Sequence, residues 1–456
     1  MATSHEGSVT AAQPRTSILK VAGASLVGTT VEWYDFFLYG SAAALVFNRL
    51  FFPSFDPLVG TLLAFATYAV GFVARPLGGI VFGHYGDKIG RKSMLVITLM
   101  LMGVATFLIG LLPTYGTIGV WAPILLIVLR LVQGFALGGE WGGAVLMVAE
   151  HGGPEKRGFW ASIPQAGVPL GNLLAVAVLA ALSAVQTDEQ FLSWGWRIPF
   201  LLSAVLVLIG LYIRLAVEES PVFKAAREQA AAAAATAEVA PKLPVVQVFR
   251  DYKREILVAM GARFVENASY YVFTAFILTY VTQQLQLPRG QALNAVLLAS
   301  IVHFFWIPIA GALSDRLGRR PLYLIGAAGV GIWGFVFFNL LETRSFTVMV
   351  FAVTVALIFH GTMYGPQASF FSELFGTGVR YSGASIGYQL ASIFAGSLSP
   401  IIAVALLARY RTWVPIAIYL VGGAIITIIA VLVAKETAHT DLTAVGRDRE
   451  PSPATR

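Results

Sequence analysis

The ten residues GHYGDKIGRK (83–92) return almost unchanged as GALSDRLGRR (311–320). Both copies follow the pattern Gly-x-x-x-Asp-x-x-Gly-Arg and end in a second basic residue. Each copy forms a short charged loop between two long apolar runs, and the two begin 228 residues apart in a chain of 456 residues. A charged loop repeated at half the chain length predicts two related halves.

The composition around these loops is that of a membrane protein. Hydrophobic residues make up 57% of the chain and charged residues 12%, whereas soluble proteins carry about 25% charged residues. Basic residues orient membrane spans, so the net charge of +7 does not indicate nucleic-acid binding. The chain has no cysteine, which excludes disulfides and Cys-ligated metals. We expect no cofactor and no metal.

Apolar runs of spanning length fall into two sets of six. The first set lies at 18–46, 59–84, 93–112, 121–149, 158–184 and 196–217, and the second at 254–284, 290–313, 321–341, 346–372, 381–408 and 412–434. Most Lys and Arg residues fall on the side of the membrane that holds both termini. This bias predicts that both termini are cytoplasmic, in a multi-pass protein of a bacterial-type inner membrane.

The predicted organisation has five parts. They are an N-terminal cytoplasmic tail (1–17), a first six-helix bundle (18–217), a cytoplasmic linker (218–253), a second six-helix bundle (254–434) and a C-terminal cytoplasmic tail (435–456). The first tail is polar and lacks a signal-peptide pattern.

A second pair of charged residues supports the duplication. Glu150 and Arg157 are seven residues apart after the fourth span of the first half, and Glu373 and Arg380 have the same spacing in the second half. The two pairs are 223 residues apart, close to the offset of the loops. Internal repeats of this kind are common in transporters.

The chemistry of the repeated loops fits a gate. Asp87 and Asp315 are expected near the N-terminus of the following helix, where the helix dipole favours an anion. Arg91 and Arg319 are expected to reach an acid on a neighbouring helix end, with Glu150 and Glu373 as the candidates. Alternatively, these charges only cap helices and fix sidedness. The predicted gating residues are Asp87, Arg91, Glu150, Arg157, Asp315, Arg319, Glu373 and Arg380.

The repeated decapeptide resembles the loop signature of the major facilitator superfamily. Six further motifs are VEWYDFFLYG (31–40), ARPLGG (74–79), RLVQGFALGGEWGGA (130–144), WGWRIPF (194–200), EESP (218–221) and RYSGASIGYQ (380–389), and they resemble its metabolite:proton symporter family. The stretches TDEQFLSWGWRIPFL (187–201), AFAT (64–67) and FNRLFFP (47–53) are most similar to the shikimate transporter branch. The resemblance implies an all-α membrane protein, with twelve transmembrane helices in two pseudo-symmetric six-helix bundles that work by alternating access.

Seven ionisable residues lie within the predicted spans, where each costs free energy unless it has a partner or a function. Four are acids and three are arginines, so one acid is a candidate proton carrier. The predicted proton-coupling residues are Asp35, Glu32, Glu140 and Glu266. The resemblance implies that helices 1, 4, 7 and 10 surround the cavity, and it places all four acids there.

Arginine binds a carboxylate through two parallel hydrogen bonds, which suits an organic anion. Amides and aromatic rings can bind the hydroxyls and ring of the same substrate. The predicted substrate-binding residues are Arg130, Arg263, Arg75, Tyr34, Trp141, Gln165, Tyr270, Tyr271, Tyr364 and Gln389. Permanent interhelical packing is the alternative, and it weighs most for Arg75 beside Pro76. His303 and His360 receive no role.

The predicted function is proton-coupled import of a small organic acid, with shikimate or a similar hydroxylated carboxylate preferred. A dicarboxylate, a 2-oxo acid or a betaine/proline-type osmolyte is the alternative. The short tail without heptads counts against an osmolyte carrier. A non-transporting membrane sensor is a hypothesis of a different class. No enzymatic activity is expected. The expected partners are the organic anion, protons and the lipid bilayer, without nucleic acid, and the protein is expected to be a monomer.

Overall fold

The structure is a computed structural model. It describes residues 18–89, 91–138, 145, 148–149, 154–216, 244–375, 380–438 and 440; the side chains of 80, 83–89, 91–95, 213–216, 244–247 and 380–382 are not among those described. Within these ranges the chain is almost entirely helical and contains no strand. The predicted linker 218–253 is described only from Pro244 onward.

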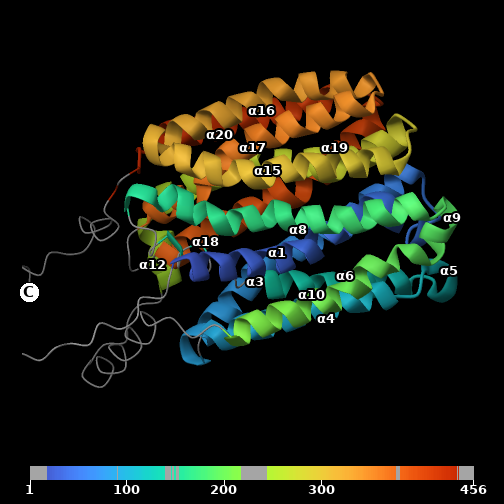
Figure 1. Ribbon diagram of the computed structural model, residues 1–456, viewed down its shortest axis with the longest axis horizontal. Helices are drawn as coiled ribbons and strands as arrows, with labels where there is room; N and C mark the ends of the chain where they lie inside the picture. The colour runs from blue at the N-terminus through green and yellow to red at the C-terminus, as the bar shows by residue number, and fades with distance from the viewer. Residues whose placement is uncertain are drawn as a thin grey trace, which may run out of the picture.

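Six long helical segments form the first half (Figure 1). Short helical turns connect several of them. The elements are α1 (Ile18–Ala42), η1 (Ala43–Phe47), α2 (Asn48–Leu50), α3 (Pro57–Ile89), α4 (Arg91–Leu111), α5 (Tyr115–Ile118), α6 (Trp121–Leu137), η2 (Pro154–Lys156), α8 (Arg157–Val185), α9 (Asp188–Gln190), η3 (Phe191–Gly195) and α10 (Arg197–Ala216).

The second half repeats this arrangement after the short helix α12 (Pro244–Asp251). Its elements are α13 (Lys253–Tyr271), η4 (Val272–Phe276), α14 (Ile277–Thr279), η5 (Tyr280–Gln284), α15 (Arg289–Leu317), α16 (Arg319–Glu342), α17 (Phe346–Leu374), α18 (Arg380–Ala391), η6 (Ser392–Ser397), α19 (Leu398–Tyr410) and α20 (Val414–Val433). In both halves the first long helix continues into a π-helical turn, η1 at residue 43 and η4 at residue 272. These turns are 229 residues apart, so the repeat seen in the loops extends into the membrane.

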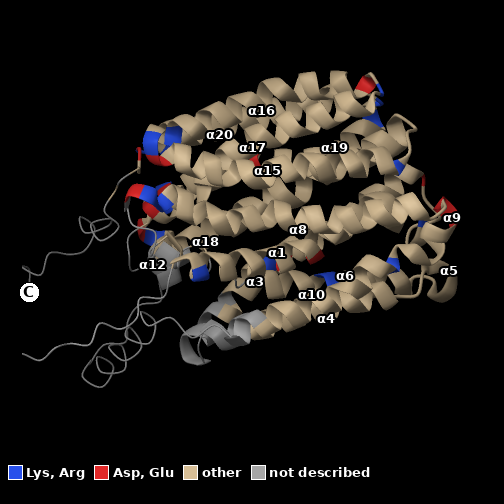
Figure 2. Ribbon diagram, viewed as in Figure 1, with Lys and Arg blue, Asp and Glu red and all other residues tan. Residues whose placement is uncertain are grey.

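Seven of the described helices are long and apolar enough to span a membrane, or eight if the bent pair 188–195 and 197–212 counts as one span. Val96–Leu111 and Trp121–Leu137 are shorter apolar helices. Most charged residues gather at the two ends of the bundle, and few lie between them (Figure 2). This distribution is expected where the middle of the helices faces lipid.

The repeated decapeptide forms less loop than the sequence predicted. In the second copy, α15 ends at Leu317 and α16 begins at Arg319, so one glycine separates two long helices. Gly318 has a backbone φ of +97°, which residues with a Cβ rarely adopt. The charged residues around it are therefore fixed on helix ends rather than on a mobile loop.

Helices α8 and α15 form the most extensive contact between the halves. They approach closely at one end because Gly158 and Gly311 face each other: a Cβ on Gly158 would lie 2.5 Å from the Gly311 oxygen. The interface at this end leaves no room for a side chain at either position. It places the charged ends of the two halves in direct contact.

Candidate functional site

A narrow cavity of about 20 Å³ lies between the two halves. Helices α1, α3, α6 and α8 of the first half line it, and α18 of the second half closes it. The lining residues are Thr29, Glu32, Trp33, Arg75, Leu137, Val145, Pro164, Gln165, Tyr388 and Gln389. Four of them, Glu32, Arg75, Gln165 and Gln389, were predicted as site residues.

Arg75 is the buried cation of this cavity. It is 2% exposed, and its Nε and Nη2 atoms have no hydrogen-bond partner among the described residues. Its guanidinium carbon lies 4.2 Å from the ring centroid of Phe72 and 4.3 Å from that of Phe36. These rings hold the guanidinium in place but leave the N–H groups of Nε and Nη2 available to an acceptor in the cavity.

A polar chain occupies the first half beside this cavity. Arg130 donates to Gln133 (3.0 Å), and Gln133 donates to the Thr106 hydroxyl (2.6 Å). The carboxyl of Asp35 lies against the same hydroxyl, and its Oδ1 has no partner in the described residues. Asp35 and Arg130 are 1% and 0% exposed. The first half therefore holds a buried acid and a buried cation that are separated by two neutral side chains.

The second half pairs its charges directly. Arg263 donates from Nη1 to Glu266 (3.1 Å) and to Gln367 (2.7 Å), and Gln367 donates to the same Glu266 oxygen (2.8 Å). The guanidinium carbon of Arg263 lies 3.3 Å from the ring centroid of Tyr388, which lines the cavity. His360 contacts the other oxygen of Glu266 (2.9 Å). Sequence reasoning left this histidine unassigned.

Four predicted gating residues meet where α8 and α15 approach, and we call Arg157, Asp315, Arg319 and Glu373 the end cluster. Arg157 of the first half pairs with Glu373 of the second (3.0 Å). Arg319 pairs with Glu373 (3.2 Å) and with Asp315 (2.8 Å). All four are at most 7% exposed. The predicted contact between Arg319 and Glu373 is present. Arg157 of the first half binds the same Glu373 and so connects the two halves.

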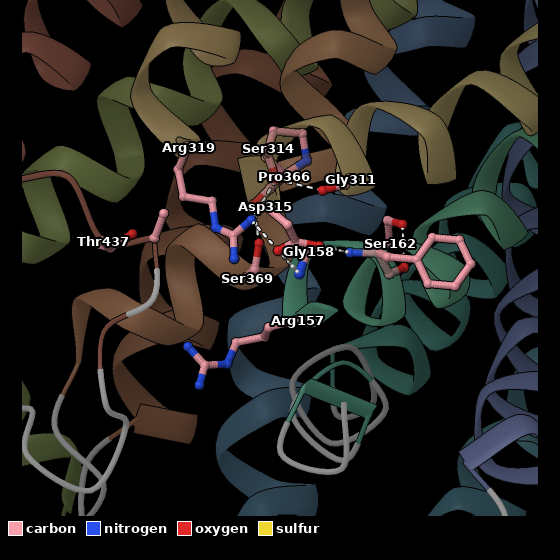
Figure 3. Close-up of polar contacts among 12 residues, drawn as sticks. Arg157, Gly158, Ser162, Gly311, Ser314, Asp315, Arg319, Pro366, Ser369 and Thr437 are labelled. Carbon is pink, nitrogen blue, oxygen red and sulfur yellow. Dashed lines mark hydrogen bonds and ion pairs between the residues drawn. The ribbon is translucent and has the colours of Figure 1, made fainter. Parts of the chain in front are cut away.

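Asp315 meets a different helix N-terminus from the one predicted. Its two oxygens accept the backbone N–H groups of Gly158 (2.8 Å) and Phe159 (2.9 Å), in the first turn of α8 (Figure 3). The residue was expected to cap the helix that follows it in the chain, α16. A carboxylate at a helix N-terminus is stabilised in either case. Here the stabilised contact joins the two halves.

The N-terminus of α16 is capped by a residue that sequence reasoning did not consider. Glu436, just after α20, accepts the backbone N–H groups of Arg319 (2.9 Å) and Arg320 (3.0 Å). Burial favours a raised pKa for Glu436, but these N–H groups and those of Thr437 and Ala438 outweigh it, and the pKa is lowered. Thr437 also donates to Glu373 (2.7 Å). The tail therefore contacts the end cluster.

The opposite end of the molecule also joins the halves through polar contacts. Arg289, at the start of α15, pairs with Asp188 and donates to Ser183 (2.8 Å). Gln283 donates to Thr61 (2.8 Å). Neither contact was predicted, because no motif repeats at these positions. The two halves are therefore in contact near both ends of the bundle.

The remaining predicted residues are distributed around the site. Tyr34 donates to the Pro199 carbonyl (2.8 Å) and is engaged within the first half. Tyr270, Tyr271 and Tyr364 are buried near the halves' polar cores without lining the cavity. Glu140, Trp141 and Glu150 lie outside the described residues, as do the side chains of Asp87, Arg91 and Arg380.

Two six-helix bundles with a cavity between them are the architecture expected of a major facilitator transporter, and the comparisons agree. Residues 20–448 match the model of the family described as "Sugar (and other) transporter". The chain belongs to this family of membrane transporters, and it is not an enzyme.

Curated relatives match along nearly the whole chain. The shikimate transporter of Escherichia coli K12 is 44% identical over 434 residues, which are 95% of this chain and 97% of the relative. The inner membrane metabolite transport protein YhjE of the same organism is 41% identical, over 94% of this chain and 97% of the relative. The proline/betaine transporter of that organism is 34% identical, over 93% of this chain and 84% of the relative.

Solved structures show the same fold. A crystal structure of a D-xylose-proton symporter superposes with a TM-score of 0.71 at 18% identity, covering 94% of this chain and all of the other. A partially occluded, inward-open xylose transporter XylE from E. coli gives a TM-score of 0.69 at 18% identity, covering 92% of this chain and 98% of the other. The predicted fold of twelve helices in two bundles is confirmed.

Proposed function

We propose that this protein imports a small organic acid together with protons, by alternating access. The preferred substrate is shikimate or a similar hydroxylated carboxylate. The observation that carries the proposal is Arg75, a buried guanidinium with two unsatisfied nitrogens facing a cavity between the halves. An unsatisfied buried cation is costly, and a substrate carboxylate is the group that relieves that cost.

The other residues that line the cavity have the chemistry to bind a ring with hydroxyl groups. The amides of Gln165 and Gln389 both line it, and the Oε1 of Gln389 has no partner among the described residues. Trp33 and Tyr388 supply aromatic faces. An acceptor amide oxygen and aromatic faces together can hold a hydroxylated ring whose carboxylate is bound by Arg75.

The proton is assigned to Asp35. In the described residues no Lys, Arg or His lies within 4.0 Å of its carboxyl. The Thr106 hydroxyl beside it donates to the Met102 carbonyl (2.9 Å) and accepts from Gln133. Because that hydroxyl has only one proton, a protonated Asp35 is the form that can hydrogen-bond to it. This arrangement supports a carrier that is neutral while buried and releases its proton when water reaches it.

Alternating access is assigned to the two sets of contacts between the halves. The end cluster closes the end that we propose to be cytoplasmic, with Arg289, Asp188, Gln283 and Thr61 closing the other. One set must open while the other holds, because a pathway open at both ends would dissipate the proton gradient. Both halves of one chain line the cavity, so a monomer is sufficient.

Uptake into proteoliposomes tests this function. Labelled shikimate, 2-oxoglutarate and glycine betaine are offered separately, with the outside acidified and with equal pH on both sides. We expect gradient-driven accumulation of shikimate and little of the other two. A protonophore should abolish it. Shikimate uptake that ignores the gradient contradicts the proton coupling, and exclusive uptake of another compound contradicts the substrate.

A zwitterionic osmolyte is the second candidate. Glu32 and Trp33 line the same cavity as Arg75, and an aromatic face beside a carboxylate is suited to a quaternary ammonium group. The 34% identical relative is named as a proline/betaine transporter. Betaine uptake in the same experiment would favour this candidate.

A further inference from the structure

Three buried side chains of the second half form a continuous hydrogen-bonded chain. Oε1 of Glu266 on α13 lies 2.9 Å from Nε2 of His360 on α17. Nδ1 of that histidine lies 2.9 Å from Nε2 of His303 on α15. Glu266, His360 and His303 are 2%, 1% and 1% exposed. Three helices therefore contribute one titratable group each to a single line.

The hydrogen-bonding capacity of each group fixes the tautomers of this chain. A carboxylate only accepts, so His360 carries its proton on Nε2 and donates to Glu266. The Nδ1 of a neutral His360 must then accept, and His303 donates to it from Nε2. This leaves a lone pair on Nδ1 of His303, an atom that is buried and has no hydrogen-bond partner in the described chain. The hydrogen-bonded chain therefore begins at Nδ1 of His303, which can accept a proton, and ends at the carboxylate of Glu266.

We propose that His303 and His360 form a proton relay that delivers a proton to Glu266. A proton binds to Nδ1 of His303, the Nε2 proton of His303 passes to Nδ1 of His360, and the Nε2 proton of His360 passes to Oε1 of Glu266. One proton enters and one arrives. Both imidazoles end neutral with their tautomers reversed, and every hydrogen bond of the line is kept with its direction inverted. The proton comes from the gradient, so this inference rests on the proposed proton-coupled transport.

Protonation of Glu266 reaches the cavity through Arg263. Oε2 of Glu266 accepts from Arg263 (3.1 Å) and from Gln367 (2.8 Å). A neutral Glu266 holds this guanidinium less strongly, because the charge-assisted part of the bond is lost. Arg263 is stacked on Tyr388, whose ring lines the cavity. His303 and His360 are therefore positioning residues that act on the substrate site through Glu266 and Arg263.

Apart from Glu266, the described side chains that surround the two imidazoles are aromatic or neutral polar groups. Tyr270 of α13 packs on both imidazoles, with centroid distances of 4.8 Å to His360 and 5.8 Å to His303, and Tyr364 of α17 packs on His360 at 5.3 Å. From α16 the hydroxyl of Tyr323 reaches the group through Gln367. From α8, Asn172 contacts Ser300, one turn from His303. Among the described neighbours, Glu266 is the acid within 4.0 Å of either imidazole.

The test compares two modes of transport in proteoliposomes. His303→Asn and His360→Gln are measured for gradient-driven shikimate accumulation and for exchange of labelled against unlabelled shikimate at equal pH, from pH 5.5 to pH 8.5 in rough half-unit steps across the histidine range. We expect accumulation to fall by roughly a hundredfold. Exchange should persist but lose the part of its pH dependence that comes from Glu266, because Glu266 no longer receives its proton. Substrate-induced alkalinisation of a weakly buffered exterior should be lost as well.

Trp306→Phe provides the matched control. Trp306 donates to Thr362 (3.1 Å) and so joins the same two helices, α15 and α17, without a titratable group. We expect this variant to retain accumulation and an unchanged pH profile. Two results would overturn the relay: wild-type accumulation in both histidine variants, or loss of exchange together with accumulation in both. Failure of the wild-type protein to accumulate shikimate under a gradient would instead reject the proposed function.

Discussion

The two halves share one fold but hold their buried charges differently. In the first half, Asp35 and Arg130 are separated by Gln133 and Thr106. In the second half, Arg263 and Glu266 form an ion pair at 3.1 Å on consecutive turns of one helix. The helix ends repeat closely, as the loops at 83–92 and 311–320 show. The two halves therefore share their helix arrangement and their charged helix ends, but they differ in how their buried charges are paired.

This difference assigns different work to the halves. A buried ionisable group without an ion-pair partner is suited to a ligand or proton that comes and goes, because leaving it charged and unpaired costs on the order of several kcal/mol. Among the described residues, Arg75 and Asp35 of the first half form no ion pair, and we propose them for substrate and proton. The paired charges of the second half are satisfied among themselves. They respond to a proton by rearranging, which suits control of the site.

The largest effect is expected for Asp35→Asn. An amide cannot carry the proton, so gradient-driven accumulation should fall by roughly a hundredfold or more, while exchange at equal pH continues. Uptake and exchange of labelled shikimate in the same vesicles measure both. Glu266→Gln is the comparison in the second half, because its amide mimics the protonated acid. This variant should lose more of its gradient-driven accumulation than of its exchange, each relative to the wild-type protein. Full accumulation by Asp35→Asn would remove this residue from the proton path and erase the proposed division between halves.

Arg75→Gln should have the next largest effect, on affinity. Loss of two charge-assisted bonds to a carboxylate is worth about 3 kcal/mol, or roughly a hundredfold in Kd. Arg130→Gln is the matched control, because Arg130 is equally buried but is absent from the cavity lining. Its effect should be roughly tenfold smaller. Equilibrium binding of labelled shikimate to purified protein decides between them, and equal losses would contradict the special position of Arg75.

The sequence predicted the fold well, for a physical reason. Apolar runs must span the membrane as helices, and repeated charged motifs mark helix ends. The π-helical turns at 43–47 and 272–276 could not be predicted, because such a turn depends on packing rather than on a local sequence pattern. The loops proved shorter than expected, since Gly318 alone is enough to separate α15 from α16.

The site was only partly predictable. Intramembrane charges singled out residues that the structure buries between the helices, such as Asp35, Arg75 and Glu266, but spacing could not show which of them have partners. Arg75 was the residue for which a packing role, beside Pro76, weighed most as an alternative to substrate binding. The structure places it in the lining of the cavity. His303 and His360 lie 57 residues apart on different helices, and only the packing of α15 against α17 brings them together. Long-range pairs of this kind leave no trace in a single sequence.

Glu373→Gln tests the junction of the halves and should have a smaller effect. Glu373 bonds both Arg157 and Arg319, so its loss weakens the link between the first and second halves. We expect the open state of this end to gain about 1.4 kcal/mol, a tenfold rise in its population. Because the chain has no cysteine, Ser162→Cys, buried beside Gly311, introduces a single thiol that reports opening by maleimide labelling. Glu155→Gln, an exposed acid near α8, should leave labelling unchanged.

The smallest effect is expected for Glu436→Gln, which tests whether the tail supports this junction from the second half alone. The carboxylate caps α16 through the N–H groups of Arg319 and Arg320. Its loss should raise labelling of Ser162→Cys by roughly threefold at neutral pH, the usual cost of a helix cap. The pKa of Glu436 is lowered in the folded protein. Its stabilisation is therefore complete above the ordinary pKa of a glutamate and is lost as the pH falls through the lowered value.

The ratio of labelling in Glu436→Gln to that in the parent protein should accordingly stay constant near neutral pH and approach one in acid. Taking the ratio removes the pH dependence of the thiol itself. A ratio that rises in acid has the wrong sign for a capping carboxylate. A ratio of one at every pH would mean that the end cluster holds the halves together without help from the tail. Closure of this end would then depend on the pair of Arg157 and Glu373 rather than on Glu436.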